Sequence, residues 1–194
     1  MADFVARVGP YTDWSEAKRL AVMKRIVTLA SDASRLRMAA TLLPDDYDRL
    51  PIEDKARIPD PYGLCLSACV ARTAALFRQH DFKESVDYVF ESGDDGQGTV
   101  KEKLEEIFRD PVARTKYAFG SLSFAGKTDF PALQLADVLA YETGRFVPHV
   151  LGWDTSPVRK CFQAMLDDGN PYASMLFNFE ELSNIARHQE TENP

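Results

Sequence analysis

The segment that decides the fold reads Leu133-Gln134-Leu135-Ala136-Asp137-Val138-Leu139-Ala140-Tyr141-Glu142. On the 3.6-residue period of a helix, Leu135, Val138 and Leu139 point one way, whereas Gln134 and Asp137 share a different stripe. An acid in so apolar a run must be hydrogen-bonded, bound to a metal or turned to water, because burying a lone charge is costly. The pattern predicts a helix, on which Asp137 is either part of an ordinary polar stripe or a functional acid.

A second acidic site lies upstream of this helix. The β-branched and aromatic run Val86 to Glu91 predicts a buried strand that stops at Glu91. Asp94 and Asp95 follow in a Gly-rich turn, and a helix is expected from about Thr99 to Arg109. A carboxylate at the carboxyl end of a strand in an α/β protein lies where ligands usually bind. Glu91 is therefore either a functional acid or a structural one, whereas the two aspartates are expected only to shape the turn.

Strands and helices alternate along the chain, which predicts an α/β fold with helices on a small, mainly parallel sheet. Polar residues 45–57 are expected to form a loop with one short helical turn, a helix is expected to open at Ser156-Pro157, and residues 172–179 are ambiguous. The remaining expected elements are helices at 15–31, 61–79 and 180–189, strands at 36–43, 86–91 and 117–124, and the helix that carries Asp137, with Pro131 in its first turn.

Composition predicts one globular domain, residues 1–189, followed by a frayed tail, residues 190–194. No apolar run approaches the roughly 18 to 20 residues of a membrane helix, and the first residues lack the features of a signal peptide. The odd number of cysteines, 3, argues against a disulfide framework. A reducing cytoplasm is therefore the expected location.

The formal net charge of −7 weakens the case for a surface that grips nucleic acid by charge alone. Basic residues nevertheless gather on the first helix, and Lys18 and Arg25 are candidate substrate contacts. The plainer interpretation of these residues is a solvated helix face.

Several catalytic classes find no support in the sequence. The turn Gly93 to Gly98 has glycines, but its two acids would repel a phosphate. No set of residues suggests a serine or cysteine nucleophile, and the three histidines, His80, His149 and His188, are scattered.

Two blocks resemble the domain of unknown function 3800 family. They are Tyr88-Val89-Phe90-Glu91-x-Gly93-Asp94-x-Gly96 and the segment 133–142, with Lys127 between them. The resemblance spans most of residues 1–146, and Leu133 to Asp137 is its most specific part. It implies an RNase H-like fold and metal-dependent hydrolysis of phosphodiesters by two ions, Mg²⁺ or Mn²⁺, held by carboxylates.

Carried over by position, Glu91 and Asp137 would be catalytic metal ligands, and the fold would have to bring them together. Lys127 would be a catalytic residue that faces a phosphate. Gln134 would contact substrate, and Glu142 matches the motif with a less certain role. Nucleic acid is the substrate that this resemblance implies.

The chain departs from the family pattern at its start. Members begin with a strand that ends in Asp-Glu-Ser-Gly, whose aspartate is the presumed central metal ligand, and no such strand precedes Met1. Either translation starts further upstream, or the chain is a shortened member of the family. A shortened member would have an RNase H-like sheet without its opening strands and an uncovered edge that can pair with a second copy, and its nuclease would be inactive for want of this acid. The alternatives are a non-catalytic binding or assembly protein on the same scaffold, and a small-molecule enzyme with its pocket at Glu91.

Overall fold

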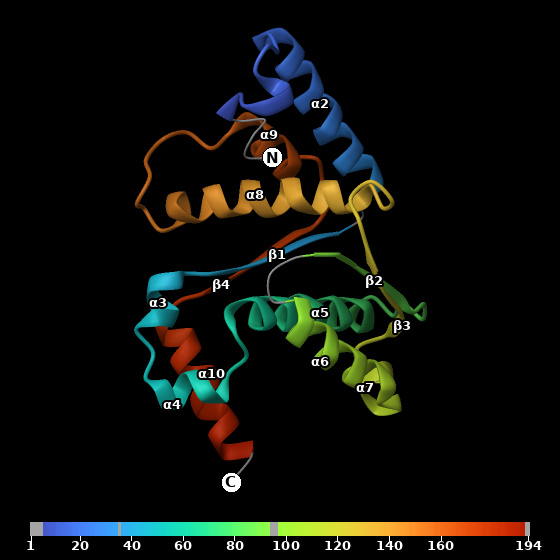
Figure 1. Ribbon diagram of the computed structural model, residues 1–194, viewed down its shortest axis with the longest axis vertical. Coiled ribbons are helices and arrows are strands. Elements are labelled where there is room, and N and C mark those ends of the chain that lie inside the picture. The colour runs from blue at the N-terminus through green and yellow to red at the C-terminus, as the bar shows by residue number, and fades with distance from the viewer. Residues whose placement is uncertain (1–5, 35, 94–96, 193–194) are drawn as a thin grey trace. The chain divides into compact units, whose positions relative to one another are not determined.

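The computed structural model describes residues 6–34, 36–93 and 97–192. Strands within these ranges form two sheets of two strands each, β1 with β4 and β2 with β3, and helices make up most of the remaining residues (Figure 1). The predicted α/β class is confirmed. The finer prediction of an RNase H-like sheet remains a prediction.

The chain divides into two compact units. Unit 1 consists of Met1–Ala39 and Pro131–Ser174, and unit 2 consists of Ala40–Phe130 and Met175–Pro194. Each unit is thus built from two separate stretches of chain, and the boundary between them falls within strands β1 and β4. The single domain over residues 1–189 stays a prediction, and the two units are described separately below.

Unit 1 is mainly helical. Its long helices are α2 (Glu16–Ala33) and α8 (Ala132–Val150), and two shorter ones are η1 (Gly9–Tyr11) and α9 (Lys160–Leu166). Ser15 caps α2 by accepting a hydrogen bond from the backbone N–H of Lys18, as its side chain type favours. The last helix of this unit begins four residues later than the expected start at Ser156, because the residues before Lys160 form a loop.

The core of unit 1 confirms the apolar face predicted for α8 only in part. Val138 is buried together with Ala30, Phe162 and Met165. Leu135 and Leu139, which were expected on the same buried stripe, are half-buried and pack against this cluster. They lie at the margin of the core because the buried face of the helix is centred on Val138 and Glu142 instead.

Unit 2 contains the parallel strands that carry Glu91. Strands β2 (Val86–Glu91) and β3 (Phe119–Ala125) pair in parallel, with Glu91 opposite Ala125 and an irregularity between Val86 and Tyr88. The helices of this unit are α3 (Pro44–Asp48), α4 (Ile52–Arg57), α5 (Pro61–Gln79), α6 (Gln97–Arg109), α7 (Pro111–Lys116) and α10 (Phe179–Glu192). Residues 45–57 therefore form two short helices rather than a loop with a single turn.

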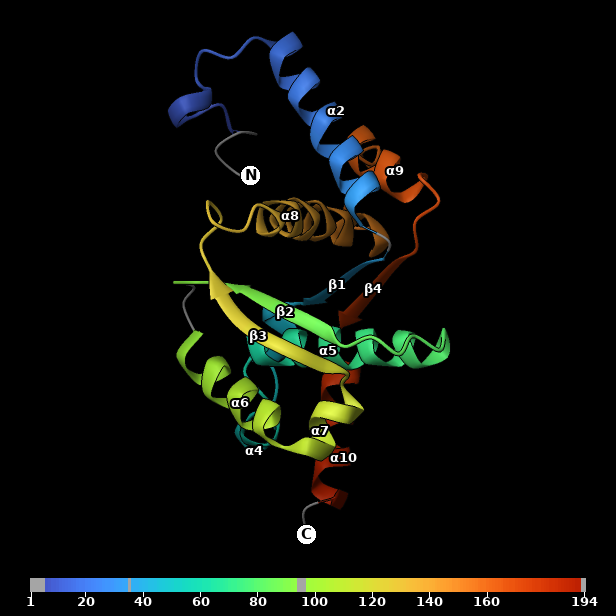
Figure 2. The same ribbon diagram turned by 90° about the vertical axis from the view of Figure 1, so that its right-hand side faces the viewer.

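Aromatic side chains occupy one face of the β2–β3 pair. Tyr88 and Phe90 lie two residues apart on β2, and their rings contact Phe119 and Phe124 of β3 at centroid distances of 4.7 and 5.7 Å. Helices α6 and α7 lie on one side of these strands (Figure 2), and Phe108 of α6 meets the ring of Phe119 edge-on. This packing fixes the direction of β2 and hence the place of its last residue.

The ambiguous segment 172–179 forms strand β4 (Tyr172–Phe177), which pairs with β1 (Arg37–Leu42). The backbone N–H of Arg37 donates to the carbonyl of Pro171, and that of Leu43 donates to the carbonyl of Phe177. The residue numbers of the paired positions increase together on the two strands, so β1 and β4 are parallel.

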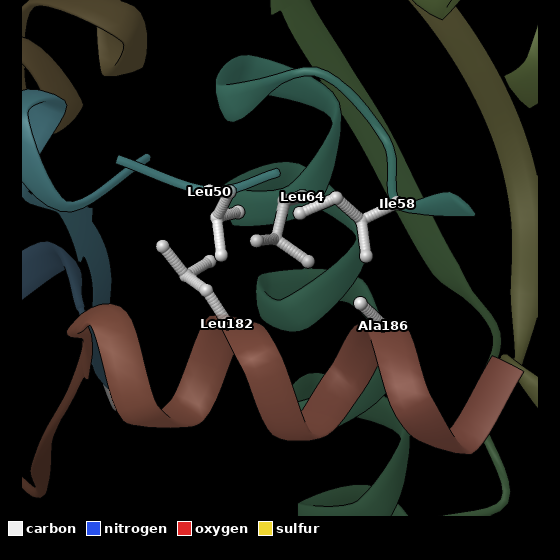
Figure 3. Packing of buried hydrophobic residues seen from close by; sticks show 5 residues of the cluster. All are labelled: Leu50, Ile58, Leu64, Leu182 and Ala186. Atoms are coloured by element: carbon white, nitrogen blue, oxygen red, sulfur yellow. The ribbon is translucent and has the colours of Figure 1, made fainter. Parts of the chain in front are cut away.

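Helix α10 completes the apolar core of unit 2. Leu182 and Ala186 of this helix are fully buried against Leu50, Ile58 and Leu64 (Figure 3). Leu50 follows α3 and Ile58 follows α4, so the two short helices place two of the five residues of this cluster. This packing explains why the polar segment 45–57 folds.

None of the helices within the described residues is long and apolar enough to span a membrane. The three cysteines, Cys65, Cys69 and Cys161, are free and half-buried.

Candidate functional site

Glu91 occupies the position that the sequence predicted for it. It is the last residue of β2, at the carboxyl end of a pair of parallel strands. Tyr88 and Phe90, which precede Glu91 on the strand, pack against aromatic rings of β3, and Gly93, with a φ of +97°, lets the chain turn away directly afterwards. The geometry therefore presents this carboxylate at the sheet edge where ligands of α/β proteins usually bind.

Lys127 lies beside Glu91, as expected if the two act together. The lysine follows β3 by two residues, and its Nζ is 3.0 Å from Oε2 of Glu91. The side chains are 35% and 28% exposed respectively, so water reaches both of them. An ion pair this open to solvent adds at most about 1 kcal/mol to stability. The pair is consequently free to exchange partners at low cost.

The two groups have complementary chemistry toward a phosphodiester. A carboxylate oxygen is a ligand that divalent cations such as Mg²⁺ prefer, and an ammonium group attracts a phosphate oxygen. In the absence of any ligand they neutralise one another. Either a cation at Glu91 or an anion at Lys127 would have to compete with this pairing.

Asp137 and Gln134 lie on α8 and belong to unit 1, whereas Glu91 and Lys127 belong to unit 2. Asp137 is half-buried and Gln134 is exposed, and each has an interaction partner. The approach of Asp137 to Glu91 therefore stays a prediction.

Lys18 and Arg25 lie on α2 in unit 1, and both are exposed. The Nζ atom of Lys18 lies 4.0 Å from the centre of the Trp14 ring, a cation–π contact. This contact gives Lys18 a local structural role. Substrate binding by either residue remains a prediction.

A complete metal site is not present within residues 6–34, 36–93 and 97–192. No three side chains of histidine, cysteine, aspartate or glutamate in these ranges gather closely enough to hold a metal ion. Asp94 and Asp95, which follow Glu91, lie outside the described residues. The carboxylate of Glu91 has the chemistry and the exposure of a ligand for a divalent cation. The further ligands that such an ion needs are not gathered around it among the described residues.

Among the residues whose burial the structure describes, the most deeply buried acid is Glu142, which sequence reasoning identified only as a motif position. Its side chain on α8 is 1% exposed, and Oε1 lies 2.8 Å from Nη1 of Arg159. Arg145, His149 and Phe162 line a cavity of about 40 Å³ beside it. A signal was available, because Glu142 follows Val138 by four residues and therefore shares the buried face of the helix.

Burial dominates the ionisation of this site. It raises the pKa of Glu142 above its ordinary value, although the Arg159 guanidinium and a hydrogen bond with Cys161 act in the opposite direction. Burial and the neighbouring Glu142 carboxylate likewise raise the pKa of the Cys161 thiol. The ion pair between Glu142 and Arg159 joins the second half of α8 to the loop that precedes α9.

The fold and these side chains define an α/β protein with small parallel sheets and a carboxylate–lysine pair at a sheet edge. No known protein family, no curated protein and no solved structure matches the chain in the comparisons made. The resemblance drawn from the segments at 88–96 and 133–142 accordingly stays a prediction.

Proposed function

We propose that this chain is a metal-dependent nuclease of the RNase H-like type, in which Glu91 contributes a metal ligand and Lys127 faces a phosphate of the substrate. The observation that carries this proposal is the 3.0 Å pairing of Glu91 with Lys127 at the carboxyl end of two parallel strands. The resemblance of the surrounding sequence to a family with this presumed chemistry supports it further.

Each residue of the pair has a separate task. Glu91 would offer an oxygen ligand from a rigid strand end, and a bound divalent cation would supply stabilisation of the attacking and leaving oxygens. Lys127 would release Glu91 and turn to a non-bridging phosphate oxygen, so that the same ammonium group holds the acid before binding and the substrate afterwards. Asp137 is the second acid that the resemblance implies.

Metal titration of the full chain tests the proposal. Calorimetry should detect Mn²⁺ binding to the native protein, and E91Q should weaken it by about tenfold or more, since a charged oxygen ligand is lost. E53Q removes the charge of an exposed glutamate on α4 and should leave the affinity unchanged. D137N should weaken binding as E91Q does, if both acids serve the same ion.

Substitution of Lys127 separates metal binding from cleavage. K127Q removes the competing ammonium group, so it should retain or strengthen Mn²⁺ binding while it weakens cleavage of a single-stranded DNA or RNA oligonucleotide. Absence of Mn²⁺ uptake by the native protein, or equal affinity in E91Q, would contradict the proposal.

One observation favours the alternative of a non-catalytic binding or assembly protein. Glu91 is neutralised by a lysine, and no three ligating side chains in the described ranges gather around it. On this alternative the pair is a structural contact, neither Mn²⁺ binding nor cleavage is measurable, and both E91Q and K127Q lower stability by less than about 1 kcal/mol.

A further inference from the structure

A second site of different character lies in unit 2, at the amino-terminal end of the same strands. A pocket of about 540 Å³ is lined by the residues that precede or begin β2 and β3, including Ser85, Ala118 and Phe119. Five residues of strand separate this end from Glu91, or about 16 Å at 3.3 Å per residue. Its volume falls in the range of pockets that bind small molecules.

The pocket wall is basic in a chain of net negative charge. Four cationic side chains line it, Arg78, Lys83, Arg114 and Lys116, against the single acid Glu84. Lys83 forms an ion pair with Asp81. Within the described part of the chain, neither Arg114 nor Lys116 forms an ion pair, and their charges lie 4.6 Å from the Phe108 ring centre and 5.2 Å from that of Tyr117. Two positive charges are therefore available to an anion.

The rest of the lining is apolar and includes an exposed ring. Ala74 and Phe119 are buried at the floor, at 1% and 5% exposed. Phe82 lines the wall and is 53% exposed, although a large hydrophobic side chain is usually covered. Its backbone N–H donates to the carbonyl of Phe77, and the two rings lie 5.2 Å apart, so Phe82 is held in place at the pocket. A fixed, exposed ring of this kind suits stacking against a flat ligand.

Backbone strain is also concentrated here. Ala118, which lines the pocket, has a φ of +52°, and Asp81, beside Phe82, has a φ of +55°. Such conformations are uncommon for residues other than glycine and cluster at functional sites. Asp81 follows α5 and Ala118 follows α7, and these two helices and the residues after them carry the basic and aromatic side chains of the pocket.

We propose that this pocket binds a small molecule that combines a flat ring with a phosphate, of the size of a nucleoside monophosphate. The ring stacks on Phe82 above the apolar floor, and the phosphate lies against Arg114 and Lys116. The site is separate from Glu91, and its existence does not depend on the proposed nuclease function.

Calorimetry with three probes tests this assignment: AMP, adenosine and inorganic phosphate. Because both halves of the pocket contribute, AMP should bind the full chain at least about tenfold more tightly than either of the other two. The double variant R114Q/K116Q should weaken AMP binding by about tenfold or more and leave adenosine binding unchanged. F82A should weaken both AMP and adenosine.

R109Q is the matched control, because Arg109 is an exposed cation at the end of α6 that does not line the pocket. It should bind AMP as the native protein does. Circular dichroism verifies that each variant is folded, and the single variant K116Q, at an exposed position, serves if the double variant is not. AMP binding no tighter than that of phosphate, or equal weakening by R109Q and K116Q, would overturn the proposal.

Discussion

At the scale of single residues, the pair Glu142–Arg159 joins a fully buried carboxylate to a partly exposed guanidinium. The Glu142 side chain is 1% exposed, whereas that of Arg159 is 33% exposed. Removing one member of a buried ion pair leaves the other uncompensated. Water can solvate an abandoned arginine at this position but cannot reach an abandoned glutamate.

We therefore expect R159A to be the more harmful of the two substitutions. At pH 8 it should lower the free energy of unfolding by about 3 kcal/mol or more, because it strands a buried carboxylate. E142Q should cost less, because it leaves a neutral amide inside and a hydrated cation outside. Urea unfolding of both variants checks the order, and a larger loss in E142Q would contradict it.

Acid should reduce the damage in R159A. The folded state raises the pKa of Glu142 above the unfolded value, so the folded protein binds the proton more tightly. The penalty for the stranded acid is absent below the unfolded pKa and grows as the pH rises through the folded one. The stability difference between R159A and R159A/E142Q should accordingly shrink as the pH falls from 8 toward 4. A difference independent of pH would contradict this assignment.

At the scale of elements, the short turn from α7 into β3 stores strain at Ala118. This residue joins Lys116 and Tyr117 to the strand with a φ of +52°, and its carbonyl accepts the first hydrogen bond of β2, from Val86. This backbone conformation costs an L-residue roughly 1–2 kcal/mol, whereas glycine adopts it without this cost.

A118G should therefore raise the free energy of unfolding by about 1 kcal/mol, although glycine usually destabilises a protein. Its control is A113G in the interior of α7, which should lower that energy by about 0.5–1 kcal/mol. Thermal or urea unfolding measures both. Equal losses in the two variants would show that the turn at Ala118 is not strained.

Elements with strong local signals were predictable. The strand that ends at Glu91 has a β-branched and aromatic run followed by glycine, and the start of α5 has a proline after an aspartate cap. Residues 172–177 lack such alternation, because β4 is half-buried on both faces and its pairing with β1 is distant in the chain. Residues 45–57 are polar, and their two short helices depend on packing against α10.

The candidate site, like the elements, was predictable only where the sequence carries a local signal. Glu91 was a candidate because it ends a strand of a parallel sheet, and Lys127 because it matches a basic position of the resembled family; the structure places the two side chains 3.0 Å apart. The basic pocket could not be found in this way, because its cations come from the end of α5, the following loop and α7, and no short motif joins them. The burial of Glu142 was missed because it was considered only as a motif position, although its spacing of four residues from Val138 predicts the buried face of the helix.

At the scale of the whole molecule, the chain passes from one unit to the other three times, after Ala39, Phe130 and Ser174. Two of these crossings lie within strands β1 and β4, so each of these strands contributes residues to both units. We expect such a chain to unfold in a single cooperative transition. L182A empties part of the unit 2 core and F162A part of the unit 1 core, and each should lower the free energy of unfolding by about 2–5 kcal/mol.

L182A and F162A should each lower the midpoint of one and the same urea unfolding transition. L20A, at a side chain that is 56% exposed, should change the stability by less than about 0.5 kcal/mol. Two separate transitions, each sensitive to only one of the core variants, would show instead that the units unfold independently.

The position of α10 has a consequence for synthesis on the ribosome. Leu50, Ile58 and Leu64 leave the exit tunnel early, yet the helix that covers them, with Leu182 and Ala186, is translated about 120 residues after them. Until then these side chains stay in water, where exposed apolar surface promotes aggregation. A nascent chain stalled before residue 179 is expected to recruit holdase chaperones, and release of those chaperones should coincide with the emergence of the final helix.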